Sequence, residues 1–329
     1  MHPTHIIRQI YAAAVIACLF SSCIYDYDNC PERIAFTIVN DWSGCSYANP
    51  DGMAYIFFSN SDGDPWRYDF PGMEAGKISL PEGNYSFISY NDDTSGVYFK
   101  ENRGYGGYTA YCRECDLFDG LADSKPARSS ADEPVVRCPS MMWGCAYWSF
   151  DLTFGMLSYI PHGTPDSDVA QVSPPEMRLI AHQKPLVAHY TCDIQDVTNL
   201  GGVSRLRASM SGMSDSLNLT SGHRSALRST LPFAARATDS NTIRSEFHTF
   251  GPADSPACTN ILNLYVWLTD GRRFNYEFDV SDQVRSAPDP MNVYIRLRGL
   301  DLPESDIGGS GGFGVSVDGW TTVVINITT

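Results

Sequence analysis

The chain has 329 residues, and 38 acidic side chains against 23 Lys and Arg give it a net charge of −15. This negative balance, without any cluster of Lys and Arg, argues against a nucleic-acid-binding protein, because phosphate contacts need grouped basic side chains. The length suits two domains of ordinary size. A composition of 18 Tyr, 16 Phe, 27 Gly and 20 Pro favours strands and turns over helices.

The first thirty residues have the form of an export signal. An apolar run from Ile10 to Phe20 follows a weakly basic start and is too short for a bilayer span, which needs about 20 residues. Ser21 and Ser22 precede Cys23, an ending that resembles a bacterial lipobox, in which the cysteine becomes the new N-terminus and carries the lipid. We therefore expect a signal peptide over residues 1–22, palmitate and related acyl chains on Cys23, and a tether over residues 23–32.

Two alternatives stand beside this interpretation. Cys18 is a rival lipid site, but cleavage there would leave a very short apolar core, so Cys23 is favoured. The second alternative is an ordinary secretory signal in which the cysteine is incidental and carries no lipid. The acidic residues at positions 24–28 resemble the tags that send some lipoproteins to the outer face of the cell, although a plain solvated tether has the same composition. The segment predicts a lipid-anchored protein of the outer membrane that faces outward.

Residues 33–160 are predicted to form a first domain of short strands. Arg33–Val39 alternates apolar and polar residues, as a half-buried strand does, and Met53–Phe58 and Tyr85–Tyr90 are further strands. Pro81-Glu-Gly-Asn84 reverses the chain before the last of these. Residues 140–157 are apolar and aromatic and are expected to close the domain as a strand or hairpin. Strands separated by regularly spaced turns predict a β-sandwich.

A Pro-rich segment over residues 161–175 is predicted to be a linker, followed by a second β-domain over residues 176–329. Its clearest element is a hairpin, in which strands 261–268 and 273–280 are joined through Asp270-Gly271, a turn that matches strand twist. One helical turn is expected at residues 281–287. A Gly-rich run over 308–314 reads as a hinge before a final strand at 320–327. The predicted fold is all-β, with two tandem β-sandwich domains of transthyretin-like or Ig-like build.

Four cysteines are candidates for disulfides, and they are Cys112, Cys115, Cys138 and Cys145. An exported protein meets conditions in which disulfides persist. Reduced packing cysteines are the alternative. A zinc site is disfavoured, because the spacing of the second pair is too wide for a zinc knuckle and no histidine lies nearby.

The sequence contains no catalytic or cofactor motif. It has no Gly-x-Ser-x-Gly elbow and no HExxH, and its Gly-rich run lacks the Lys and Ser/Thr of a phosphate-binding loop. We therefore expect no enzymatic activity, no cofactor and no metal. Tyr98, Tyr105 and Tyr108 lie in or beside a Gly-rich stretch, and tyrosines on loops supply contact area for partners or sugars. The alternative is ordinary core packing.

Several motifs resemble an uncharacterised family of Bacteroidales lipoproteins, a domain of unknown function. They include Asp41-Trp42, Asn49-Pro-Asp-Gly-Met53, Leu80-Pro-Glu-Gly-Asn-Tyr85 and Val266-Trp-Leu-Thr-Asp-Gly271. That family is similar to the membrane-anchored subunits of type V fimbriae. The resemblance implies two transthyretin-like β-sandwiches held on the outer membrane by an N-terminal lipid.

The resemblance also implies the function. We expect a fimbrial anchor or accessory subunit, or a surface adhesin, whose partners are pilin-like subunits that bind by strand addition to an exposed sheet edge. A surface glycan-binding module is the first alternative, and it would present coplanar aromatics on an exposed face. A lipid-tethered hydrolase is the second, and it would show convergent carboxylates or a histidine cluster in a deep cleft.

Overall fold

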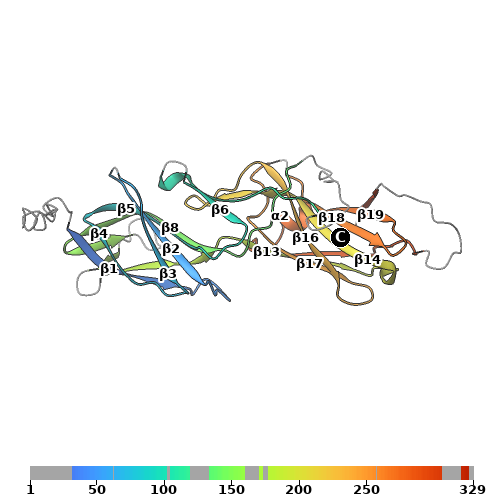
Figure 1. Ribbon diagram of the computed structural model, residues 1–329, viewed down its shortest axis with the longest axis horizontal. Coiled ribbons are helices and arrows are strands. Elements are labelled where there is room, and N and C mark those ends of the chain that lie inside the picture. The colour runs from blue at the N-terminus through green and yellow to red at the C-terminus, as the bar shows by residue number, and fades with distance from the viewer. Residues whose placement is uncertain are drawn as a thin grey trace, which may run out of the picture.

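The computed structural model describes residues 32–61, 63–101, 104–118, 133–159, 170–172, 177–256, 258–305 and 320–325. The molecule is elongated, with two β-rich lobes arranged along its long axis (Figure 1). One lobe holds β1 to β5 and β8, the other holds β13 and β16 to β19, and β6 lies between them. The expected all-β class is confirmed.

The N-terminal lobe is a sandwich of two sheets. The smaller sheet has the order β11-β1-β4 and the larger has the order β10-β9-β8-β5-β2-β3, with β12 paired to β8. The strands of the smaller sheet are β1 (Arg33–Asp41), β4 (Lys77–Pro81) and β11 (Arg178–His182). Those of the larger sheet are β2 (Gly52–Ser59), β3 (Trp66–Pro71), β5 (Gly83–Asn91), β8 (Trp143–Thr153), β9 (Met156–Tyr159), β10 (Ala170–Val172) and β12 (Lys184–Pro185). The predicted closing hairpin corresponds to β8 and β9.

Aromatic side chains fill the space between these two sheets. Phe36 of β1 meets Phe57 of β2 and Phe150 of β8 edge-on, with ring centroids 6.1 Å apart in both pairs. Such pairs add about 1 kcal/mol each to the free energy gained from burial. The alternation predicted for Arg33–Val39 is confirmed, because Ile34, Phe36 and Ile38 are buried.

The strands β2 and β5 are buried on both faces, which explains their nearly continuous apolar sequence. Tyr55 and Phe57 face the core between the two N-terminal sheets. Ile56 and Phe58 face the other way, into a second core that continues into the C-terminal lobe. The outer face of the first sandwich is therefore covered by the rest of the molecule.

The C-terminal lobe is built on one eight-stranded sheet with the order β20-β13-β17-β16-β14-β18-β19-β21. Its strands are β13 (Ala188–Gln195), β14 (Val203–Ser214), β16 (Arg228–Ala237), β17 (Ile243–Thr249), β18 (Ile261–Leu268), β19 (Arg273–Asp279), β20 (Asn292–Arg298) and β21 (Thr321–Ile325). Among the described residues of the whole chain, the helical elements are α2 (Ser281–Arg285), as expected near residue 281, and the short turns η2 (Tyr105–Gly107) and η3 (Leu200–Gly202).

The predicted hairpin is confirmed in its strands and in the position of its turn. Leu262 pairs with Phe278, Leu264 with Tyr276 and Val266 with Phe274. Gly271 has φ +91°, a conformation that glycine adopts without the steric cost of a side chain.

A three-stranded sheet joins the lobes. It has the order β15-β7-β6, with β6 (Val97–Glu101) and β7 (Tyr108–Cys112) from the first half of the chain and β15 (Ser216–Asn218) from the second. Tyr108 of β7 shares a 2.7 Å hydrogen bond with Tyr90 of β5 inside the continuous core. The lobes thus form one body with a shared apolar core.

The boundary expected between the two domains differs from the strand pairing. Residues 178–185 were assigned to the second domain, yet β11 pairs with β1 and β12 pairs with β8 in the first lobe. β10 falls inside the expected linker and pairs with β9, while residues 160–169 and 173–176 of that segment lie outside the described residues. A strand that returns to an earlier sheet carries no local signal of that pairing.

A buried ion pair in the C-terminal sheet gives a testable stability effect. Asp193 accepts two 2.7 Å hydrogen bonds from Arg244 and one from Tyr294, and its side chain is only 2% exposed. The hydrogen bonds from Arg244 lower the pKa of Asp193, so the carboxylate stabilises the fold above about pH 4 and this contribution is lost as the pH falls through the lowered pKa.

We therefore expect Asp193→Asn to reduce the free energy of unfolding by about 2 kcal/mol at pH 7. The difference between wild type and variant should shrink as the pH falls from about 4 through the lowered pKa of Asp193, because the carboxylate is protonated first in the unfolded state and then in the folded state. Urea denaturation at pH 7 and pH 3 measures both effects. Asp196→Asn, at an exposed neighbouring position, is the control. An equal loss at both pH values would contradict the role of the charge.

Candidate functional site

The strand β21 forms one edge of the eight-stranded sheet, and Trp320 just before it packs against Phe118, Tyr265 and Trp267. It pairs in parallel with β19 through residues 321–325. Val323 and Ile325 pack against the core but are only partly buried, and Val324 is 67% exposed. If β21 left its place, the N–H and C=O groups along one side of β19 would lose their partners and could pair with another strand. The described sheet therefore ends at an edge strand whose side chains are at most partly buried.

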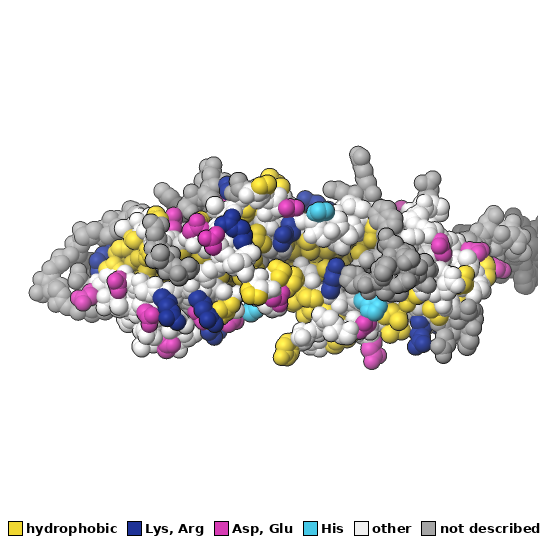
Figure 2. All heavy atoms as spheres, turned by 180° about the vertical axis from the view of Figure 1, so that it is seen from behind, with side chains coloured by type: hydrophobic (Ala, Val, Ile, Leu, Met, Phe, Trp, Pro, Cys, Tyr) yellow, Lys and Arg dark blue, Asp and Glu magenta, His cyan; other side chains and the backbone are white. Residues whose placement is uncertain are grey.

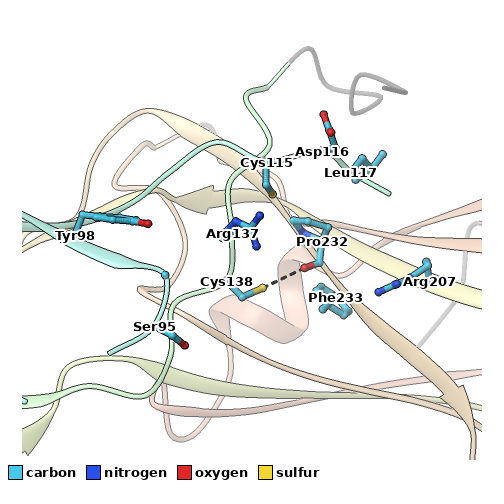
Figure 3. A pocket seen from close by; sticks show the side chains of 11 residues that line it. Ser95, Tyr98, Cys115, Asp116, Leu117, Arg137, Cys138, Arg207, Pro232 and Phe233 are labelled. Carbon is cyan, nitrogen blue, oxygen red and sulfur yellow. Dashed lines mark hydrogen bonds between the residues drawn. The ribbon is translucent and has the colours of Figure 1, made fainter. Parts of the chain in front are cut away.

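A second feature is a cavity of about 500 Å³ beside β6, which is one strand of the sheet that joins the lobes. Figure 3 shows side chains from distant parts of the chain around it, including Tyr98, Arg137 and Arg207. Its other lining residues are Ser95, Gly96, Cys115, Asp116, Leu117, Cys138, Pro232 and Phe233. The cavity thus combines two guanidinium groups, one carboxylate and two aromatic rings.

Cations and aromatic rings alternate on the outer side of β6 and β7. The guanidinium of Arg113 lies 3.6 Å from the ring centroid of Tyr98, and the ammonium of Lys100 lies 4.3 Å from that of Tyr111. Tyr98 and Tyr111 are themselves neighbours, with ring centroids 5.8 Å apart. These contacts hold the Tyr98 ring at the rim of the cavity.

The prediction that three tyrosines contact a partner is wrong for two of them. Tyr105 and Tyr108 are only 8% and 1% exposed, and both pack against Phe58 in the core. Glycines beside a tyrosine indicated a loop, but η2 and β7 turn these rings inward. Tyr98 is partly exposed and lines the cavity, so partner contact by Tyr98 stays a prediction.

The four candidate disulfide cysteines do not form one group. Cys145 lies in the core of the N-terminal sandwich beside Ser89, whereas Cys112 and Cys138 belong to the core shared by the lobes. None of the cysteines in the described residues is joined in a disulfide in this structure. Burial raises the pKa of Cys112 and of Cys145 to about 12, which disfavours the reactive thiolate. A disulfide among Cys112, Cys115 and Cys138 stays a prediction.

One carboxylate–imidazole pair has a thiol close to it. Asp41 Oδ2 lies 2.6 Å from His182 Nδ1, and Cys45 Sγ donates a 3.1 Å hydrogen bond to the carbonyl oxygen of Gln183. Burial raises the pKa of Cys45 to about 11, so this thiol is protonated at neutral pH. The arrangement links β1 to β11 and offers no activated nucleophile.

Charge and metal-ligating groups are dispersed over the described surface. On the face drawn in Figure 2, basic side chains stand singly or in small groups among acidic ones. Within the described residues, no three His, Cys, Asp or Glu side chains are grouped as a metal site requires. No helix of the described part of the chain combines the length and apolar character needed to cross a membrane.

The chain is similar in sequence and in fold to several known proteins. A family model described as "Domain of unknown function (DUF5119)" matches residues 17–234. The chain belongs to this family. A segment of 77 residues is 29% identical to the "Putative fimbrium anchoring subunit Fim4B" of Bacteroides ovatus, and the match covers 23% of this chain and 23% of that protein. The matched segment therefore represents less than a quarter of that relative.

Solved structures similar to this chain include an adhesin-like protein and a fimbrial anchor protein. The crystal structure of a "putative adhesin" from Bacteroides ovatus ATCC 8483 has a TM-score of 0.64 at 18% identity, covering 85% of this chain and 96% of that one. The fimbrial anchor protein Mfa2 from Porphyromonas gingivalis has a TM-score of 0.48 at 12% identity, with 82% and 91% covered. The similarity to the first of these structures shows the fold of the chain.

Sequence reasoning missed the arginines of the cavity. Arg137 follows a short β-bridged segment, and Arg207 lies within β14. The cavity brings together residues from positions 95 to 233, so no local motif contains its lining. The one usable signal was a charged residue, Arg207, directly before the buried run that begins at Ala208 in β14.

Proposed function

We propose that the protein is an outer-membrane lipoprotein, anchored through acyl chains on Cys23 and facing outward, that serves as a fimbrial anchor or accessory subunit or as a surface adhesin. The observation that carries this proposal is the 29% identity to a named fimbrium anchoring subunit over 77 residues. The apolar run that ends in Ser21-Ser22-Cys23 supports the lipid anchor. The role is one of binding and holding, without catalysis.

The partners are pilin-like subunits that bind by strand addition. A strand of the partner takes the position of β21 and pairs with the edge of β19. Two features support this edge: β21 has a single strand neighbour, and its side chains are at most partly buried. Backbone hydrogen bonds along β19 would supply affinity, and the apolar side chains beneath would select alternate side chains of the incoming strand.

A pull-down from outer-membrane extract tests the proposed function. The tagged full-length protein should co-purify with pilin-like subunits that mass spectrometry identifies. A chain that lacks residues 320–329 is the companion variant, and it should bind such subunits more readily because the β19 edge is already open. Retention on a glycan array without any co-purified subunit would replace the anchor role by the glycan-binding alternative.

A further inference from the structure

The cavity beside β6 contains a cation for which the described residues supply no ion-pair partner. Arg207 lies on β14, is partly buried and lines the cavity. Within the described residues, this guanidinium makes no hydrogen bond and no ion pair. A guanidinium stays protonated in proteins, and burying part of it without a partner costs free energy. Arg207 therefore has an unmet capacity to bind an anion.

Two other arginines of the same sheet have the carboxylate partner that Arg207 lacks. Arg244 binds Asp193 at 2.7 Å, and Arg228 lies 3.3 Å from a Glu133 oxygen, although both arginines are more than one third exposed. In a chain with a net charge of −15, acidic partners are common. Arg207 lines a cavity instead, and this position points to a ligand that supplies the carboxylate.

The groups around Arg207 narrow the chemistry of that ligand. Figure 3 shows the Tyr98 hydroxyl and the Arg207 guanidinium directed into the cavity from opposite sides, with Arg137 between them. Asp116 adds a carboxylate, which accepts hydrogen bonds from hydroxyl groups. Phe233 and the Tyr98 ring offer apolar surface on which a sugar ring can pack.

We propose that this cavity binds a hexuronic acid residue of an acidic polysaccharide, with Arg207 pairing with the sugar carboxylate. One ligand then satisfies each kind of group present: its carboxylate meets the guanidinium, its hydroxyls donate to Asp116, and the C–H face of its ring contacts the aromatic side chains. A planar guanidinium can bind a carboxylate through two parallel hydrogen bonds, which selects the acid over a neutral sugar. The volume of about 500 Å³ accommodates one or two sugar residues.

An acidic peptide matches these groups less well. It brings several carboxylates and few hydroxyls, so Asp116 would face like charge instead of a hydrogen-bond donor. The proposal goes beyond anchoring, because it gives the protein a contact with glycan that does not involve the β19 edge. Binding measured without any fimbrial subunit therefore tests it independently of the proposed function.

Isothermal titration calorimetry with the purified protein tests the proposal. The probes are α-1,4-digalacturonic acid and its neutral counterpart, α-1,4-galactobiose. We expect the acid to bind at least about tenfold more tightly, since a hydrogen-bonded charge pair contributes that much. Arg207→Gln should reduce the affinity for the acid to that for the neutral sugar. Arg205→Gln, the same change at an exposed position of the same strand, should leave both affinities unchanged.

Thermal unfolding shows whether Arg207→Gln is folded, and Arg207→Lys provides a second variant that keeps the charge but loses the fork of two donors. Arg207→Lys should bind the acid with intermediate affinity. Equal binding of the two sugars by the wild type, or no binding of either, would overturn the proposal. So would an equal loss with Arg205→Gln. A triglutamate peptide that binds as tightly as digalacturonate and depends on Arg207 would replace the saccharide by an acidic peptide.

Discussion

Replacing Cys23 by alanine should release the protein from the membrane completely. Lipid attachment to a lipobox requires the cysteine thiol, and two or more acyl chains hold a protein stably because each buried methylene contributes about 0.8 kcal/mol. In cells grown with labelled palmitate, the wild type should carry label and sediment with the outer membrane. The variant Cys23→Ala should carry no label and appear in the fraction that does not sediment.

The rival cysteine in the same apolar run is the matched control. Cys18→Ala removes a thiol five positions earlier in the sequence and should leave labelling and sedimentation unchanged. Protease treatment of intact cells then reports the face of the membrane, because an outward-facing protein is digested without breaking the cells. Label that persists in Cys23→Ala and disappears in Cys18→Ala would move the lipid to Cys18. Label in neither wild type nor variants would reject the anchor.

Local turn chemistry explains which parts of the fold the sequence could predict. The β18–β19 hairpin has alternating apolar residues on both sides of Asp270-Gly271, so strands, register and inward face all follow from neighbouring residues. The same holds for β1, where Ile34, Phe36 and Ile38 alternate with polar positions. In both cases the residues that form the structure are close in sequence, and alternation of apolar and polar residues shows which side chains are buried.

The parts that escaped prediction depend on contacts between distant residues. β16 contains Pro232, which argues against a central strand, yet its ladder with β17 involves only Ala235–Ala237 and leaves the proline outside it. β15 has three residues and exists as a strand because it pairs with β7, about a hundred positions earlier. The cavity arises where these distant segments meet, so its arginines could not be grouped from the sequence.

A disulfide that fixes β21 to β19 should block strand addition. Glu277 and Val324 are paired across these two strands, and neighbouring strands lie about 4.8 Å apart, within the range for a disulfide. The double variant Glu277→Cys/Val324→Cys should therefore form the bond on the outer face of the sheet. A disulfide contributes roughly 3 kcal/mol, which would reduce the population with β21 detached by about 100-fold.

The measurement is the capture of pilin-like subunits from outer-membrane extract, with and without dithiothreitol. The oxidised variant should capture few subunits, and reduction should restore capture to the wild-type level, so the same protein serves as its own control. Gln195→Cys/Arg298→Cys places an equivalent bond between β13 and β20 at the opposite edge of the sheet and should have no effect. Undiminished capture by the oxidised β21 variant would show that subunits bind elsewhere. A block by the β20 bond instead would move the accepting edge to β13, which is opened when β20 leaves the sheet.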